Sequence, residues 1–143
     1  MDIRVFLPRD RDAVIALWEA CGLTRPWNDP GSDIAFCVSK PESTILVGEA
    51  EGPENTKRVV ASVMCGHDGH RGWLYYLAVD PALQKGGHGR AMVAAAENWL
   101  KSRGVPKVML MVRPENDRVR AFYDALGYAE EPRVIFSRRL DGK

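Results

Sequence analysis

The sequence contains no long apolar run and no marked excess of charge of either sign. No segment approaches the roughly 18 apolar residues of a membrane-spanning helix, and the first twelve residues carry charges where a secretory signal needs an apolar stretch. With 20 Lys and Arg against 19 Asp and Glu, the chain also lacks the basic excess typical of nucleic-acid-binding proteins. We therefore expect a cytoplasmic protein without a nucleic-acid or membrane partner.

Cysteine and histidine are scarce as well, with three of each in the chain. The cysteines are odd in number and show no paired spacing, which argues against a disulfide framework and against a zinc site. We expect buried, reduced thiols and no bound metal.

Segments with the two-residue hydrophobic period of strands alternate along the chain with segments that have the roughly 3.6-residue period of helices. A length of 143 residues, 45% of them hydrophobic, predicts a single domain over residues 1–143 with a substantial core. Strand patterns occupy 3–8, 43–51, 57–66, 72–80, 105–113 and 133–140, and helical patterns occupy 10–22, 34–40, 87–104 and 116–127. This order predicts an α/β (α+β) domain, with a central mixed, mostly antiparallel sheet of about six to seven strands and helices on both faces.

Capping residues and glycines mark the helix ends. Asp10 or Asp12 is expected to cap the first helix, and Asp33 the second. The segment 72–104 is expected to begin the only strand–helix–strand crossover of the sheet.

Three glycines in four positions stand where that crossover helix begins. Gly86, Gly87 and Gly89, flanked by Lys85 and Arg90, would leave unpaired N–H groups beside the positive end of the helix dipole. This arrangement favours a phosphate-binding loop over a simple connector. The residues after the last glycine do not match a P-loop, and the glycine spacing does not match a dinucleotide fingerprint.

Two blocks of the sequence resemble the GCN5-related N-acetyltransferases, the GNAT superfamily. LAVDPALQKGGHGRA (77–91) is similar to their acyl-CoA signature, and ENDRVRAFYDALGY (115–128) to a second family segment at the family's spacing. Within the superfamily the chain resembles the ribosomal-protein alanine acetyltransferases. The resemblance implies a GNAT-like fold and an N-acyltransferase that moves an acetyl group from acetyl-CoA to a primary amine by direct attack on the thioester.

The resemblance also implies where the cofactor binds. The pyrophosphate would lie on the N–H groups of the glycine loop, and the pantetheine arm would pair with the end of the fourth strand. These contacts would involve Leu77, Ala78, Val79, Gln84, Lys85, Gly86, Gly87, His88, Gly89, Arg90, Asn116 and Tyr123. No metal is implied.

Only some of the family's catalytic residues have a counterpart in this sequence. Tyr123 corresponds to the acid that protonates the departing thiolate, although a packing role is the alternative. Asn116 would hold the cofactor or an active-site water by hydrogen bonds, and a helix cap is the alternative. The alanine acetyltransferases have a glutamate where this chain has Met111, so the base is open. Glu49 is the substitute we consider, against the alternative of a solvated glutamate.

The acceptor is a small-molecule or peptide amine that the sequence does not identify. Trp27 and Asn28 lie where the family builds its acceptor site, and Tyr75 would line the cleft if the strand turns it that way. A homodimer is left open. The alternatives are a non-catalytic acyl-CoA sensor or partner-binding module, and a phosphate cradle for nucleotides.

Overall fold

The computed structural model describes residues 1–143, which group into two units, Met1–Leu110 and Met111–Lys143. The single domain expected from the length stays a prediction. No helix of either unit has the length and apolar character needed to cross a membrane.

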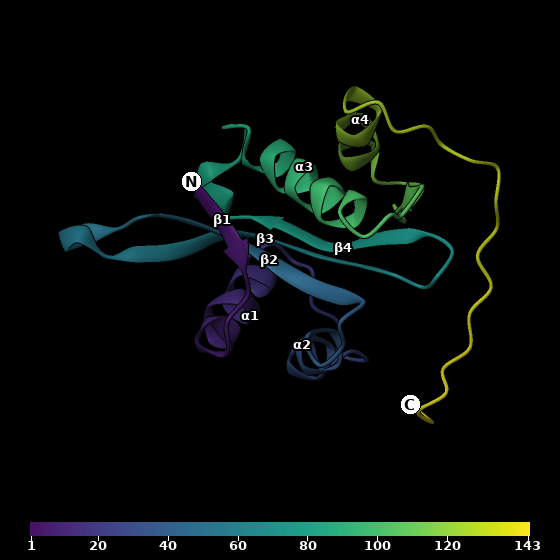
Figure 1. Cartoon of the computed structure of the whole chain (residues 1–143), viewed down its shortest axis with the longest axis horizontal. Helices are drawn as coiled ribbons and strands as arrows, with labels where there is room; N and C mark the ends of the chain where they lie inside the picture. The colour runs from purple at the N-terminus through teal and green to yellow at the C-terminus, as the bar shows by residue number, and fades with distance from the viewer. The chain divides into compact units, whose positions relative to one another are not determined.

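The first unit is built on a sheet of five strands (Figure 1). They are β1 (Asp2–Val5), β2 (Ser43–Glu51), β3 (Lys57–His67), β4 (Gly72–Val79) and β5 (Val108–Met109), in the order β1-β2-β3-β4-β5. Neighbours from β1 to β4 are antiparallel, and β4 and β5 are parallel. The mixed, mostly antiparallel sheet is therefore confirmed, but six to seven strands was wrong.

One difference accounts for the strand count: the segment 133–140 forms no strand. The expected strand 105–113 is present as β5 but is reduced to two residues. The side chains of Val134, Ile135, Phe136 and Leu140 are between 63% and 94% exposed. An apolar, β-branched sequence favours a strand only where a neighbouring strand completes its hydrogen bonds, and the structure gives this segment no such neighbour.

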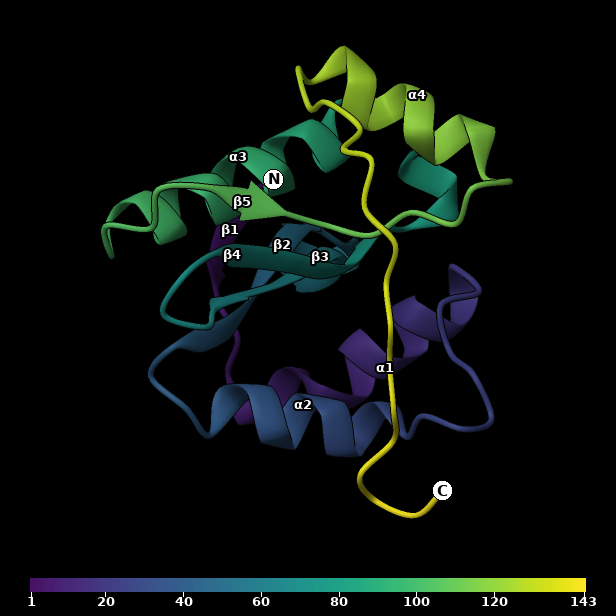
Figure 2. The same ribbon diagram turned by 90° about the vertical axis from the view of Figure 1, so that its right-hand side faces the viewer.

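Three helices cover the sheet of the first unit. They are α1 (Arg11–Ala20), α2 (Pro30–Val38) and α3 (His88–Lys101). In Figures 1 and 2, α1 and α2 lie on one face of the sheet and α3 lies on the other, as expected. The connection from β4 through α3 to β5 is the predicted crossover, since it joins the one parallel pair of strands.

The first residue of α2 differs from the expectation. The helix begins at Pro30, and the side chain of Asp29, not that of Asp33, accepts a hydrogen bond from the N–H of Ser32 at 3.0 Å. Proline is favoured at the first helical position because its missing N–H has no helical partner there. Asp33 therefore lies inside the first turn, where its side chain is available for another contact.

The core between the sheet and α1 is centred on Trp18, which is fully buried. Its ring stacks on that of Tyr76, with 3.8 Å between centroids and 5° between planes. Its Nε1–H donates to Oγ of Ser62 in β3 at 2.9 Å. The one polar atom of this large apolar side chain is thus satisfied inside the core, as buried tryptophans require.

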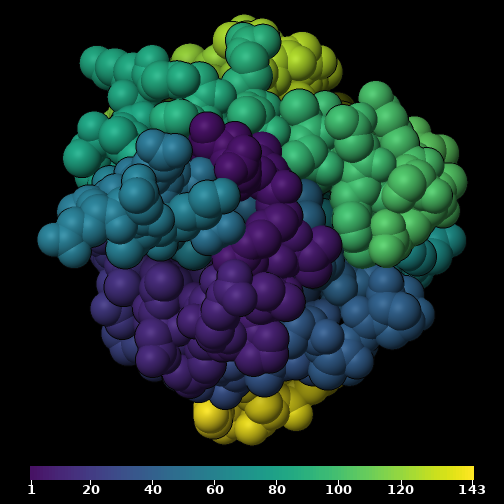
Figure 3. All heavy atoms as spheres, turned by 60° about the vertical axis from the view of Figure 1, so that its left-hand side comes forward, coloured from purple at the N-terminus to yellow at the C-terminus, as the bar shows by residue number.

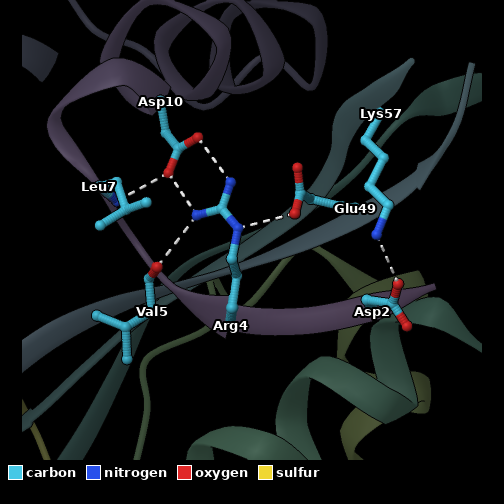
Figure 4. A network of polar contacts seen from close by, with 7 residues as sticks. All are labelled: Asp2, Arg4, Val5, Leu7, Asp10, Glu49 and Lys57. Atoms are coloured by element: carbon cyan, nitrogen blue, oxygen red, sulfur yellow. Dashed lines mark hydrogen bonds and ion pairs between the residues drawn. The ribbon is translucent and has the colours of Figure 1, made fainter. Parts of the chain in front are cut away.

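Asp10 precedes α1 but does not cap it (Figure 4). Its carboxylate is held instead by Arg4 of β1, at 2.7 and 3.0 Å, and by the N–H of Leu7 at 2.7 Å. The prediction that Asp10 caps the helix through its side chain was wrong, because Arg4 donates hydrogen bonds to both of its carboxylate oxygens. The hydrogen bonds from Arg4 lower the pKa of Asp10 below its ordinary value of 3.8.

We expect Asp10→Asn to lower the free energy of unfolding by about 2 kcal/mol at pH 7, because it weakens charge-assisted hydrogen bonds at a buried site. A carboxyl group whose pKa is lower in the folded state stabilises the protein at pH values above its ordinary pKa. This stabilisation is lost as the pH falls through the pKa of the folded state. Denaturant unfolding should therefore show a smaller difference between variant and wild type at pH 3 than at pH 7. Asp12→Asn, at a 93% exposed side chain of the same helix, is the control and should change little. An equal loss at both pH values would contradict the assignment.

The second unit contains one helix, α4 (Asp117–Ala125). Oδ1 of Asn116 caps it by accepting a hydrogen bond from the N–H of Val119 at 3.2 Å. The chain after α4 continues to Lys143 without a further helix or strand.

Candidate active site

The end of β4 is irregular, and this irregularity shapes the candidate site. In the register of β3 and β4, two residues, Tyr76 and Leu77, lie opposite the single residue Val63. Tyr76 has φ +52°, in the left-handed region that tyrosine seldom adopts. Because of this bulge, the side chains of Tyr75 and Tyr76 lie on the same side of the sheet: Tyr75 is opposite Met64, which packs on the α1 and α2 core, and Tyr76 stacks on Trp18.

The outer edge of β4 is open beyond the bulge. β5 pairs with β4 only at Gly72 and Trp73. The N–H of Asp80 donates to the carbonyl of Val60 in β3 at 2.8 Å, so the alternation of the backbone directs the N–H and C=O of Leu77 away from β3. Leu77 therefore offers a main-chain donor and acceptor at a strand edge with no strand beside it.

A short connection leads from this edge to the glycine loop. The carbonyl of Val79 accepts hydrogen bonds from Sγ of Cys21 at 3.2 Å and from Nε2 of Gln84 at 3.3 Å. Asp80 accepts from the N–H of Ala82 at 2.9 Å and from Arg58 at 2.7 Å. These contacts fix the path of the chain between the strand and α3.

The glycine loop presents main-chain donors at the start of α3. Lys85 and Gly87 both have positive φ, +73° and +82°, and no side chain caps the helix. The first hydrogen bond of the helix runs from the N–H of Ala91 to the carbonyl of Gly87 at 3.1 Å, so the preceding N–H groups have no helical acceptor. A Cβ at Gly87 would meet no atom within 4 Å. The loop is therefore an exposed set of main-chain donors at the positive end of a helix dipole, an arrangement that favours anions.

Tyr123 and Asn116 belong to the second unit. The ring of Tyr123 is buried, at 9% exposure, with edge-to-face contacts to Phe122 and Tyr128. Burial raises the pKa of its hydroxyl to about 12, so the phenol keeps its proton at neutral pH. No buried polar side-chain atom lacks a partner, and the hydroxyl of Tyr123 makes no hydrogen bond, so it reaches the surface. A protonated, unengaged hydroxyl suits a proton donor.

Glu49 is engaged in an ion pair (Figure 4). Its Oε1 accepts a hydrogen bond from Nε of Arg4 at 2.8 Å, and this contact lowers its pKa. It lines a surface cavity of about 560 Å³ along α1 together with residues of both charges, among them Arg9, Lys57 and Asp80. A general base works best when its pKa is near the operating pH, whereas Arg4 moves this carboxylate the other way. The ion pair with Arg4 therefore makes Glu49 a poor candidate for the base.

Of the residues expected at the acceptor site, Trp27 and Asn28 lie in the loop between α1 and α2 and Tyr75 lies on β4. Trp27 is 55% exposed, so its ring is turned toward solvent and not folded over the core. Arg25 and Asn28 pair across this loop. Tyr75 on β4 is 43% exposed, and Met111, at the position of the family's glutamate, is 49% exposed.

One contact of this region was missed in the sequence. The hydroxyl of Tyr76 donates to Oδ2 of Asp33 at 2.6 Å and so joins the bulge of β4 to the first turn of α2. The two residues are far apart in the chain, and no local pattern indicates the pair.

Comparison with known proteins identifies the family. The model of the acetyltransferase (GNAT) family matches residues 10–128. The chain belongs to the GNAT acetyltransferase family. An acetyltransferase of Yersinia enterocolitica is 42% identical over 140 residues, covering 98% of this chain and 96% of the relative, and one of Pectobacterium atrosepticum is 43% identical with the same coverage.

Solved GNAT structures share the fold at low identity. The aminoglycoside acetyltransferase AAC(6')-Iy, in complex with a bisubstrate analogue of CoA and acetylneamine, matches with a TM-score of 0.81 and 19% identity, over 96% of this chain and 97% of that one. A second structure of the same enzyme contains CoA and matches with a TM-score of 0.75 at 19% identity, over 96% and 98% of the two chains. The expected GNAT fold and enzyme class are confirmed, and the alanine acetyltransferase branch stays a prediction.

Proposed function

We propose that this GNAT enzyme transfers an acetyl group from acetyl-CoA to a primary amine by direct attack within a ternary complex. The observation that carries the proposal is the continuity of two features of the first unit. The open edge of β4 at Leu77 leads directly into the uncapped, glycine-rich start of α3. A linear cofactor with an amide-containing arm and a pyrophosphate needs these two kinds of donors in this order. AAC(6')-Iy, of the same fold, has been solved with CoA.

The glycine loop and the edge of β4 bind different parts of the cofactor. The N–H groups from Lys85 to Arg90 hold the pyrophosphate, and the pantetheine arm lies along the strand end Leu77, Ala78 and Val79, where it pairs with the outward-facing main chain of Leu77. Acetyl-CoA supplies an activated acyl group. A main-chain N–H of this edge stabilises the oxyanion that forms when the amine attacks.

Three proton transfers balance the reaction. The acceptor's ammonium loses one proton to become nucleophilic, its nitrogen loses a second as the amide forms, and the departing thiolate gains one, so one proton is released to solvent overall. Tyr123 is the donor in our proposal, since its raised pKa keeps it protonated. Asn116 holds the cofactor through its amide NH₂, because its Oδ1 caps α4. No residue is assigned as the base.

Calorimetric titration with acetyl-CoA, desulfo-CoA and ATP tests the proposal. We expect acetyl-CoA and desulfo-CoA to bind in the micromolar range and ATP to bind much more weakly, because ATP has no pantetheine arm to pair with β4. Thiol release with a panel of amines then separates an enzyme from an acyl-CoA sensor, which would bind the cofactor without turnover. Failure of acetyl-CoA to bind would refute the proposed function.

A further inference from the structure

Asp33 is a half-buried carboxylate without a counter-ion. Three other carboxylates of the first unit pair with arginine: Asp10 and Glu49 with Arg4, and Asp80 with Arg58. The side chain of Asp33 has one partner, the neutral hydroxyl of Tyr76 at 2.6 Å, which engages only Oδ2. A partly buried carboxylate that has no cationic partner in the protein can still bind a cation strongly.

The partner of Asp33 is held rigidly. Tyr76 sits on the bulge, and its ring stacks on Trp18, which is itself anchored by its hydrogen bond to Ser62. Oγ of Ser62 in turn donates to the carbonyl of Tyr76 at 3.2 Å. Buried surroundings and the neighbouring Asp33 charge raise the pKa of Tyr76 well above its ordinary value, so the phenol remains a donor. A residue kept in a strained backbone conformation by this many contacts is typical of functional sites.

The position of the pair relates it to the proposed reaction. Tyr76 directly precedes Leu77, whose main chain faces the open edge of β4. Asp33 lies in the first turn of α2, directly after the loop that presents the exposed Trp27. The hydrogen bond of the pair therefore joins the residue next to the edge assigned to the cofactor arm to the helix that follows the loop expected to meet the acceptor.

We propose that Asp33, positioned by Tyr76, binds a second, non-reacting ammonium group of the acceptor, so that the acceptor is an amine with two or more positive charges at neutral pH, such as a polyamine. This inference rests on the proposed function and adds the chemical class of the acceptor. The charge that Asp33 binds is not that of the reacting nitrogen. A carboxylate that held the reacting nitrogen as an ammonium would stabilise its unreactive form, whereas a second ammonium stays charged throughout the reaction.

The test is calorimetric titration of spermidine and n-butylamine into the free protein and into protein saturated with CoA. Wild type should bind spermidine at least about tenfold more tightly than n-butylamine, because only spermidine offers a second charge to Asp33. Asp33→Asn should lose this preference. Glu19→Gln, which removes one charge from an exposed position on α1, should keep it.

Tyr76→Phe separates positioning from folding. The variant keeps the ring that stacks on Trp18 and loses only the hydrogen bond to Asp33, so we expect a melting temperature lowered by only a few degrees and a spermidine preference reduced about threefold or more. The inference is overturned if Asp33→Asn binds spermidine as wild type does, or if wild type shows no preference. Acetyl-CoA titrations on the same samples report separately on the proposed function.

Discussion

Gly87→Glu is expected to raise the dissociation constant for acetyl-CoA by on the order of 100-fold, about 2.7 kcal/mol of binding free energy. The new carboxylate would stand beside the uncapped N–H groups of α3, where we assign the pyrophosphate. It would repel the phosphates and also compete with them for the same donors, since helix N-termini favour any nearby anion. Calorimetric titration of the purified variant measures the loss directly.

Gly87→Gln is the matched control for this substitution. It has the same size and pays the same cost for a side chain at φ +82°, but it carries no charge. A Cβ at this position would meet no atom within 4 Å, so neither variant should disturb the fold by collision. We expect the glutamine variant to bind within about tenfold of wild type. If both variants bind equally, the loop does not act on the cofactor through charge.

Tyr123→Phe is expected to lower kcat on the order of 100-fold while the dissociation constant for acetyl-CoA stays nearly unchanged. The substitution removes a hydroxyl that makes no hydrogen bond and keeps the ring contacts with Phe122 and Tyr128, so stability should be preserved. What is lost is the proton for the departing thiolate. Initial rates with a saturating amine, together with a titration and a melting curve, separate these effects.

The pKa of Tyr123 also predicts the pH dependence of the wild-type rate. Because the pKa is raised to about 12, the acid stays protonated as the pH rises through 10, and loss of its proton cannot reduce the rate in that range. A fall in kcat below pH 10 that is absent from Tyr123→Phe would contradict this assignment. An unchanged kcat in the variant would remove Tyr123 from the mechanism.

The elements predicted well from the sequence are those that depend on local pattern. Strands β2, β3 and β4 follow from short apolar runs separated by turn residues, and α3 from its apolar stripe after the glycine loop. The segment 133–140 has an equally good strand pattern, but a strand also needs a neighbour, which local pattern does not supply. The start of α2 was misplaced because both Asp29 and Asp33 are suitable caps, and Pro30 decides between them.

In the candidate site, too, the features that depend on local sequence were predictable and those that depend on distant contacts were not. The cofactor loop was predictable because its donors are backbone groups of consecutive residues. The partners of Glu49 and Asp33 were not, because they depend on which residues of distant segments face one another in the folded sheet. Glu49 meets Arg4 through the register of β1 and β2, and Asp33 meets Tyr76 through the bulge of β4. A shift of one residue in either register would turn these side chains to the other face.

The ion pairs of Arg4 have a consequence for the behaviour of the protein in solution. β1 is one free edge of the sheet and lies at the surface, in the purple N-terminal part of Figure 3. Free edges invite strands of other molecules to add, and short length together with inward-pointing charge discourages this. β1 has four residues, and the guanidinium of Arg4 is turned inward to Asp10 and Glu49. The contacts that fix the start of α1 thus also protect this edge of the sheet against aggregation.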